Sequence, residues 1–287
     1  MTAHRHNDGR HVPARQPAIL RFGRGFTLVE MAMVLLIVGL LLAGLIPTIS
    51  SQIEQQRRNE TRKTLEETKD ALLGFAVANG RLPCPASTAS GGTESFCTSA
   101  TTVGCIETTA LQSHGRCAKP YDGFVPAMTL GIAPINAQGQ LLDAWSNPVR
   151  YAITNTKDTS NNFYFTATDG IKTRWNSGIS LNPDLRVCPT STGLTTATPG
   201  SADCAGNAST NNAVVVIYSL GKNSATGGAG GDEAHNPNPQ TPITADRAFV
   251  FHEPAASGAT NGEFDDIVTW LSPNILYNRM VAAGKLP

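Results

Sequence analysis

The sequence predicts an α+β protein in which one long N-terminal helix packs on a mainly antiparallel β-sheet, with disulfide-linked loops around the strands. Three observations lead to this prediction: a helical pattern that runs from an apolar stretch to Asn79, β-rich segments after residue 147, and six cysteines in Ser/Thr/Gly-rich sequence. We accordingly divide the chain into a basic leader over residues 1–25, a long helix over 26–80 and an outer α+β domain over 81–287.

The leader is the most basic part of the chain. Its 25 residues carry a net charge of +4, whereas the whole chain has a net charge of +0. A basic segment directly before an apolar run stays on the cytoplasmic side of a membrane, so we expect the residues after the run to lie outside. Because no comparable basic face follows, the charge does not indicate nucleic-acid binding. The charged leader residues are Arg5, Arg10, Arg15, Arg21 and Arg24, against Asp8.

The apolar run follows the leader directly. Its 16 residues from Met31 to Ile46 are apolar without interruption, and the run lengthens to about 21 residues if it starts at Phe26. At 1.5 Å per residue this length crosses a hydrocarbon core of about 30 Å, and we predict a membrane span over residues 26–47. A cleaved secretory signal is the alternative, but the residues that follow, LIPTISSQ, contain no Ala-x-Ala site.

The helical pattern continues beyond Pro47 with polar and charged residues. Glu and Lys/Arg residues at i, i+4 spacing cover most of this second half, while a broken apolar stripe marks one face. Pro47 lacks a backbone donor and is expected to kink the helix, a feature that membrane helices tolerate. Asn79 and Gly80 form the stop signal, so the predicted helix covers residues 27–79. The stripe consists of Ile49, Ile53, Leu65, Leu72, Leu73 and Phe75.

All six cysteines follow the apolar run, which suits an oxidising compartment. An even count predicts up to three disulfides, and six cysteines allow 15 pairings that the sequence alone does not separate. Cys188 and Cys204 are far from the other four and are expected to pair with each other. A zinc site is disfavoured because no C-x-x-C pair occurs. The other four, in a region of disulfide-linked loops over residues 84–118, are Cys84, Cys97, Cys105 and Cys117.

Strand signals dominate the rest of the chain. β-branched and aromatic residues are concentrated at 148–155 and 162–168, where a polar connection predicts a hairpin, and again at 213–220, 247–253 and 264–272. Turn-rich segments separate the last three strands. At the C-terminus, Ser272 as N-cap, Pro273 at the first helical position and Gly284 as stop predict a short helix.

One short motif bears on function. Residues 25–30 read GFTLVE, between the basic leader and the apolar run. This arrangement resembles the processing signal of type IV pilins and type II secretion pseudopilins. The resemblance implies cleavage between Gly25 and Phe26 by a prepilin peptidase and N-methylation of Phe26. It also implies an inner-membrane protein with a periplasmic C-terminal domain, which an inner-membrane assembly platform draws into a pilus or pseudopilus with other subunits. Assembly residues in that family correspond to Glu30 and Pro47.

Glu30 is the residue that an ordinary membrane anchor would not need. After cleavage it is the fifth residue of the chain, near the interface, where the helix N-terminus favours a carboxylate. In a filament it is expected to neutralise the amine of Phe26 on a neighbouring subunit and so to set the axial register. A plain anchor helix with a tolerated interfacial glutamate is the alternative.

A second resemblance lies in the outer domain. The segment DAWSNPVRY, which contains Asp143 and Asn147, is similar to a turn-and-strand segment of major pseudopilins, and YSLGKN with FDDIVTW is similar to their C-terminal calcium loop. Calcium takes six to eight oxygens, and backbone carbonyls such as that of Leu220 would add to the side chains. The loop is longer here and Asn223 replaces an acid, so a solvated acidic loop is the favoured alternative. The calcium candidates are Asp232, Glu233, Asp265 and Asp266.

Three function classes remain. The first is a non-enzymatic minor pilin or pseudopilin, minor because the outer domain is large and its loops are long. The second is a binding or adhesion module at a filament tip, which the Ser/Thr/Asn-rich loops permit. The third is a tethered periplasmic enzyme, but His114, His235 and His252 lie in none of the usual hydrolase motifs.

Overall fold

The computed structural model describes residues 25–102, 104–192, 194, 204, 207–225, 231–236 and 247–287, without the side chains of residues 42–50. Residues 1–24 of the predicted leader and the side chain of Pro47 therefore lie outside the described part. The chain divides into two units, Met1–Gln52 and Ile53–Pro287.

The predicted long helix is present as α1, Leu28–Asn79. It ends where Gly80 takes a positive φ of +67°, and a side chain on this residue would meet Asp169 Oδ1 at 2.9 Å. Over the described residues, no helix is both long enough and apolar enough to cross a membrane. The span over 26–47 stays a prediction, and the side chains of its residues 42–47 are outside the described part.

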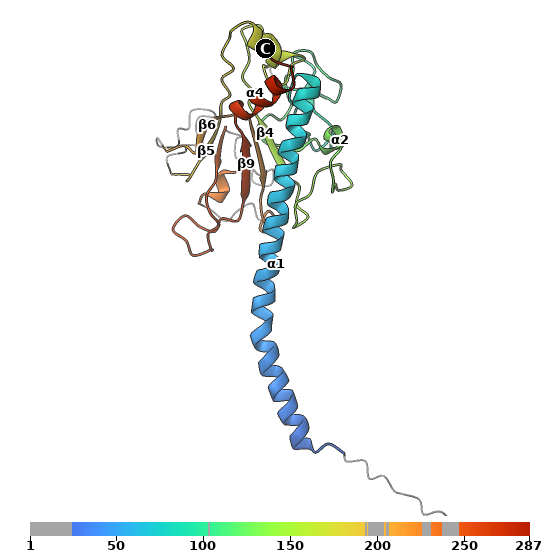
Figure 1. Ribbon diagram of the computed structural model, residues 1–287, viewed down its shortest axis with the longest axis vertical. Helices are drawn as coiled ribbons and strands as arrows, with labels where there is room; N and C mark the ends of the chain where they lie inside the picture. The colour runs from blue at the N-terminus through green and yellow to red at the C-terminus, as the bar shows by residue number, and fades with distance from the viewer. Residues whose placement is uncertain are drawn as a thin grey trace, which may run out of the picture. The chain divides into compact units, whose positions relative to one another are not determined.

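The second unit is an α+β domain with mainly antiparallel sheets (Figure 1). Its largest sheet has the order β3-β4-β7-β9 and is antiparallel throughout, formed by Gly123–Phe124, Arg150–Ile153, Val215–Ser219 and Ile267–Leu271. A second sheet has the order β6-β5-β8, formed by Thr210–Ala213, Leu185–Cys188 and Ala248–Val250. In it β5 and β8 run parallel. A small sheet pairs β1, Phe96–Cys97, with β2, Glu107–Thr108.

Short helices complete the domain. They are α2 (Ala127–Leu130), α3 (Gly170–Asn176), the 3₁₀ turn η1 (Glu233–His235) and α4 (Pro273–Ala282). The predicted C-terminal helix is confirmed as α4, because the Ser272 side chain accepts a hydrogen bond from the Ile275 N–H and Pro273 begins the first turn.

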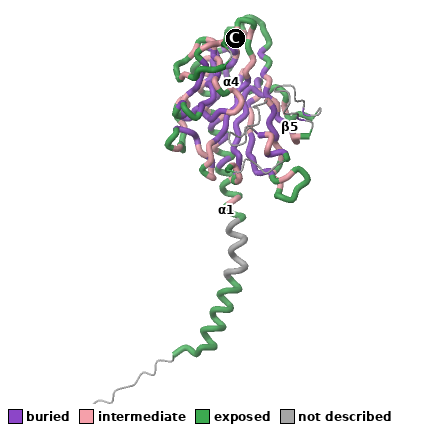
Figure 2. The backbone as a smooth tube through the Cα atoms, turned by 180° about the vertical axis from the view of Figure 1, so that it is seen from behind, coloured by how far each residue is buried: buried purple, intermediate pink, exposed green. Residues whose placement is uncertain are grey.

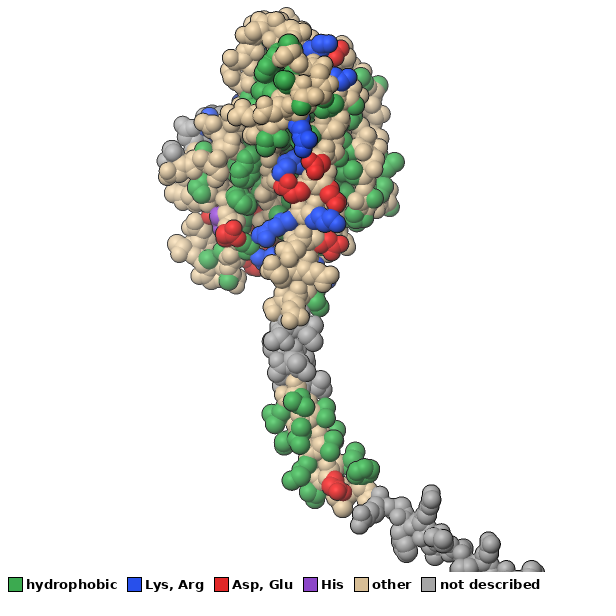
Figure 3. All heavy atoms as spheres, viewed as in Figure 1, with side chains coloured by type: hydrophobic (Ala, Val, Ile, Leu, Met, Phe, Trp, Pro, Cys, Tyr) green, Lys and Arg blue, Asp and Glu red, His purple; other side chains and the backbone are tan. Residues whose placement is uncertain are grey.

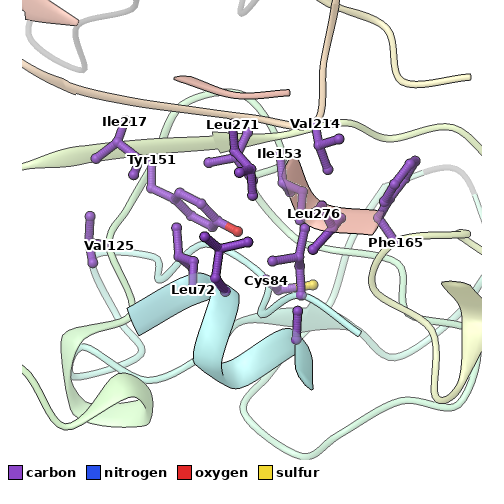
Figure 4. Packing of buried hydrophobic residues seen from close by; sticks show 14 of the residues in the cluster. Leu72, Cys84, Val125, Tyr151, Ile153, Phe165, Val214, Ile217, Leu271 and Leu276 are labelled. Carbon is purple, nitrogen blue, oxygen red and sulfur yellow. The ribbon is translucent and has the colours of Figure 1, made fainter. Parts of the chain in front are cut away.

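The largest sheet has a core on each face. Side chains alternate between faces along a strand, so Val215 and Ile217 of β7 enter one core while Val216 and Tyr218 enter the other. The first core also contains Leu72 of α1 and residues of α4 (Figure 4). The second lies against β5 and β8. All five residues of β7 are therefore buried, and the continuous run VVIY replaces the alternation of a half-exposed strand. Buried segments, purple in Figure 2, run through the interior of the second unit.

Charged side chains cover the outer face of α1 in the second unit. Acidic and basic residues mix along this helix (Figure 3) and form i, i+3 and i, i+4 ion pairs, such as Lys69 with Glu66 at 2.5 Å. Exposed pairs of this kind contribute only about 0.3–0.5 kcal/mol each. The helix is therefore held to the domain by its apolar face, which contributes Leu65, Leu72, Leu73 and Ala76 to the core.

The six cysteines form three disulfides, and no described cysteine is free. The predicted pair Cys188–Cys204 is confirmed. The other two bonds, Cys84–Cys117 and Cys97–Cys105, both lie within the predicted region of disulfide-linked loops, and the sequence had left their pairing open.

Removal of these two bonds is expected to have unequal costs. The Cys84–Cys117 bond joins residues that are 33 positions apart in the sequence, whereas the Cys97–Cys105 bond joins residues that are 8 positions apart. Chain entropy alone then gives about 3.7 and about 2.5 kcal/mol, and Cys84 and Cys117 are also buried in the main core. Urea unfolding of the paired Cys→Ala variants measures both values. An equal loss of stability for the two variants, or a larger loss for the variant that lacks Cys97–Cys105, would contradict the expected order.

One predicted hairpin is wrong. β4 pairs with β3 and β7, whereas residues 162–168 form mainly turns, with an isolated antiparallel bridge from Phe163 to Lys157. The aromatic residues that suggested a strand, Phe163 and Phe165, are 3% and 1% exposed and fill the core from these turns. Burial, rather than strand pairing, explains their presence.

Candidate functional site

Gly25, Phe26 and Thr27 directly precede α1, and Glu30 lies in its first turn. Glu30 Oε2 accepts hydrogen bonds from the Thr27 backbone N–H at 2.9 Å and from the Thr27 hydroxyl at 3.0 Å. In return, the Glu30 N–H donates to Thr27 Oγ1 at 3.2 Å. This reciprocal pair is a capping box, which satisfies donors that a helix start leaves open. The role of Thr27 was missed at the level of sequence, although the T-x-x-E spacing indicates it.

The first turns of α1 expose a continuous apolar surface. Every large apolar side chain described between Phe26 and Leu41 is exposed, from 43% at Val38 to 89% at Leu28. Soluble monomers rarely expose patches larger than a few hundred Å², because such surface is better removed from water. Lipid or other protein chains are thus the environments that this surface suits.

A buried acidic cluster lies in the second unit. Carboxylate oxygens of Glu233, Asp265 and Asp266 all lie within 4.8 Å of one another, and the three residues are 2%, 4% and 3% exposed. Glu233 belongs to η1, and the two aspartates directly precede β9. The expectation of a solvated acidic loop is therefore wrong, because the loops around these residues fold over them and exclude water.

Backbone and amide groups position the cluster. Glu233 Oε1 accepts a hydrogen bond from the Asp265 N–H at 3.1 Å, Asp265 Oδ2 accepts from the Lys222 N–H at 2.9 Å, and Asp266 Oδ2 accepts from Asn236 Nδ2 at 2.6 Å. The Oδ1 atoms of both aspartates are buried without a hydrogen-bond partner. No basic side chain forms an ion pair with the three acids within the described residues.

The electrostatics of the cluster follow from burial and mutual repulsion. Burial, with a contribution from the neighbouring Glu233, raises the pKa of Asp265 to about 7, and burial raises the pKa of Asp266 well above its usual value. In the protein alone, the protonated forms of Asp265 and Asp266 are therefore favoured more than those of exposed carboxyl groups. Two orphaned carboxylate oxygens and an all-oxygen donor set fit a hard divalent cation, which would neutralise the acids instead.

Asp232 does not belong to this group. Its Oδ1 accepts from the Ser191 N–H at 2.6 Å and from the Thr190 hydroxyl at 3.1 Å, and His252 Nε2 lies 3.1 Å from its Oδ2. Burial tends to raise the pKa of Asp232, but the hydrogen bonds, led by those from Ser191, outweigh it and lower the pKa. Asp232 is therefore the one calcium candidate that lies outside the cluster. Its hydrogen bonds join residues 190–191 to η1.

The segments of the second resemblance meet beside the cluster. Asp143 Oδ2 accepts from the Ser219 hydroxyl at 2.6 Å, and Asn147 Nδ2 donates to the Gly221 carbonyl at 2.7 Å. Gly221 has φ of +60°, and a Cβ on it would lie 2.1 Å from Asp265 Oδ1. Only glycine thus allows the chain to pass so close to the acidic cluster. The strand order β4-β7-β9 brings these distant segments together.

The three histidines of the second unit lie in separate surroundings. His114 accepts a hydrogen bond at Nδ1 from the Arg116 N–H at 3.0 Å, and burial lowers its pKa. His235 ends η1, and His252 lies beside Asp232. With every described cysteine in a disulfide, a Cys–His nucleophile is absent from the described residues.

Comparison of the chain with protein-family models, with curated proteins and with solved structures found no match. Two features of the described residues bear on function: the capped, exposed apolar start of α1 and the buried acidic cluster. The first suits association of helices in an apolar environment, and the second suits binding of a cation.

Proposed function

We propose that the chain is a non-enzymatic filament subunit, a minor pilin or pseudopilin that waits in the inner membrane and is then assembled into a type IV pilus or type II secretion pseudopilus. The observation that carries the proposal is the segment Gly25–Glu30, where a small residue, an aromatic residue and a helix-capping carboxylate precede a wholly exposed apolar surface. The fold or chemistry of a soluble enzyme would not explain that order of features.

The capping box suggests how Glu30 is accommodated before assembly. In the single chain its carboxylate receives both donors of Thr27, so the charge is solvated locally near the interface. Cleavage after Gly25 would place a new ammonium group on Phe26. In a filament, where helices exclude lipid and water, the carboxylate of one subunit would pair with the ammonium of the next and set their register.

For the outer domain we propose that Glu233, Asp265 and Asp266 hold a calcium ion. Their buried, unpaired oxygens support this proposal, and calcium would supply the positive charge that the described side chains do not. The ion would fasten η1 to the start of β9 without any part in catalysis. A chelator would remove this link between η1 and β9, whereas it would leave the disulfides intact.

Calcium is expected to raise the melting temperature of the full-length protein by about 5–10 °C. At 100 times its Kd a ligand contributes about 2.7 kcal/mol, and 1 kcal/mol shifts the melting temperature of a domain this size by about 2–4 °C. Thermal unfolding in chelator and after calcium addition measures the shift.

Two variants sharpen this test. Asp266→Asn keeps the shape and the hydrogen-bonding capacity of the side chain and is expected to lose the calcium response, whereas Asp70→Asn, on the exposed face of α1, is expected to keep it. An unchanged melting temperature for the wild type in calcium and in chelator would contradict the metal site but not the filament role.

A further inference from the structure

A pocket of about 250 Å³ lies in the second unit and shares no lining residue with the acidic cluster. α3, the loop at 155–162 and the segment before His114 contribute to it. Its volume is below the range of roughly 300–1,000 Å³ that holds drug-sized ligands, so it suits a molecule of one ring. The lining side chains that bear polar atoms include Ser113, Asp158, Asn162, Tyr164, Thr173 and Arg174.

The charged side chains in this pocket are held in place. Asp158 Oδ1 accepts from the Asn162 N–H at 2.8 Å, and Oδ2 accepts from Asn162 Nδ2 at 3.1 Å. The guanidinium of Arg174 lies 4.0 Å from the ring centroid of Tyr164, and its Nη2 donates to the Tyr164 hydroxyl. These contacts fix one acceptor and one donor group before any ligand arrives, which lowers the entropic cost of binding.

The Arg174 guanidinium has donor capacity beyond its contact with Tyr164. It carries five N–H groups, and the hydrogen bond from Nη2 to the Tyr164 hydroxyl uses one of them. Asp158 retains acceptor capacity, because each carboxylate oxygen has two lone pairs and accepts one bond from Asn162. A ligand that accepts from the Arg174 guanidinium and donates to Asp158 would use the remaining hydrogen-bonding capacity of both groups.

The charges select the class of ligand. Arg174 Nη2 and Asp158 Oδ2 lie 3.9 Å apart, so an anion would meet the carboxylate and a cation would meet the guanidinium. A neutral molecule with neighbouring hydroxyl groups meets neither penalty, since a hydroxyl both donates and accepts. Hydroxyls of Ser113 and Thr173 add further partners of the same kind.

We propose that this pocket binds one ring of a neutral carbohydrate, with adjacent hydroxyls that donate to Asp158 and accept from Arg174. The site adds glycan recognition to the outer domain and does not depend on filament assembly. Binding of a single ring, with few heavy atoms to contribute, is expected to be weak, with a Kd on the order of 1 mM.

Saturation-transfer NMR of the full-length protein, in a detergent without a sugar headgroup, tests the proposal. The probes are glucose, galactose and N-acetylglucosamine, with glycine and inorganic phosphate as charged comparisons. Saturable binding of at least one sugar is expected. Absence of sugar binding at concentrations about tenfold above the expected Kd, or preferential binding of glycine or phosphate, would overturn the proposal.

Three variants locate the binding. Arg174→Lys keeps the positive charge but removes the planar guanidinium with its five donors, and it is expected to weaken binding about tenfold or more. Thr173→Trp places a bulky side chain at the exposed rim and is expected to abolish binding without disturbing the core. Lys172→Trp, at the adjacent exposed position that does not line the pocket, is the matched control and is expected to bind normally. Equal binding by all three variants would place the sugar elsewhere and overturn the assignment.

Discussion

Replacement of Glu30 by alanine is expected to leave cleavage after Gly25 intact and to lower the recovery of the subunit in sheared filaments by at least about tenfold. The reason is that a neighbouring Phe26 ammonium would be left without its carboxylate, and an unpaired buried charge costs about 3–5 kcal/mol. Quantitative immunoblots of sheared filaments and of membranes measure incorporation and cleavage separately.

A second substitution distinguishes charge from capping. Glu30→Gln retains a side chain that completes the capping box with Thr27 but removes the negative charge. If the charge pairs with the ammonium of a neighbour, this variant is as defective as Glu30→Ala. Glu263→Ala, an exposed glutamate of the outer domain, is the control and is expected to assemble normally. Normal assembly of Glu30→Gln would reduce the role of Glu30 to that of a helix cap.

Features that depend on neighbouring residues could be predicted from the sequence. The N-cap at Ser272 and the pair Cys188–Cys204 each rest on residues that are close along the chain, and both are confirmed. β7 and β9 were also expected, because their apolar residues form runs too regular for a loop. Short-range signals of this kind are decided by backbone geometry and chain entropy.

Features that depend on distant residues could not be predicted in this way. β5 was missed, because its four residues LRVC carry a weak pattern and become a strand only through pairing with β6 and β8. Likewise, nothing near Arg81 indicates its buried, bidentate ion pair with Glu94, at 2.6 and 2.9 Å, which ties the end of α1 to the disulfide-linked loops. Tertiary packing creates both features.

The acidic cluster shows the same limit within a candidate site. The resemblance to a calcium loop named Glu233, Asp265 and Asp266 as candidates, but the choice between solvated and buried acids depended on loops that fold back from other strands. One local sign was available. Asp265 and Asp266 directly precede a fully apolar strand start, Ile267–Val268, and residues so close to a buried strand are drawn toward the interior.

Cleavage between Gly25 and Phe26 is the second large expected effect and the premise of the filament proposal. Among the described residues, a Cβ on Gly25 meets no atom within 4 Å, and the same is true of Gly39. Substitution at either residue therefore leaves the fold undisturbed. Gly25→Arg is expected to block processing completely, because the peptidase requires a small residue before the scissile bond in the family that the motif resembles, whereas Gly39→Ala is expected to be processed normally.

Intact-mass and N-terminal peptide mass spectrometry of the full-length protein, from cells with and without prepilin peptidase, tests the central claim most directly. We predict a chain that begins at N-methylated Phe26 only when the peptidase is present, and a chain that retains residues 1–25 when it is absent or when Gly25 is replaced by arginine. A chain that keeps residues 1–25 in both strains, or one that is cut elsewhere, would contradict the proposal.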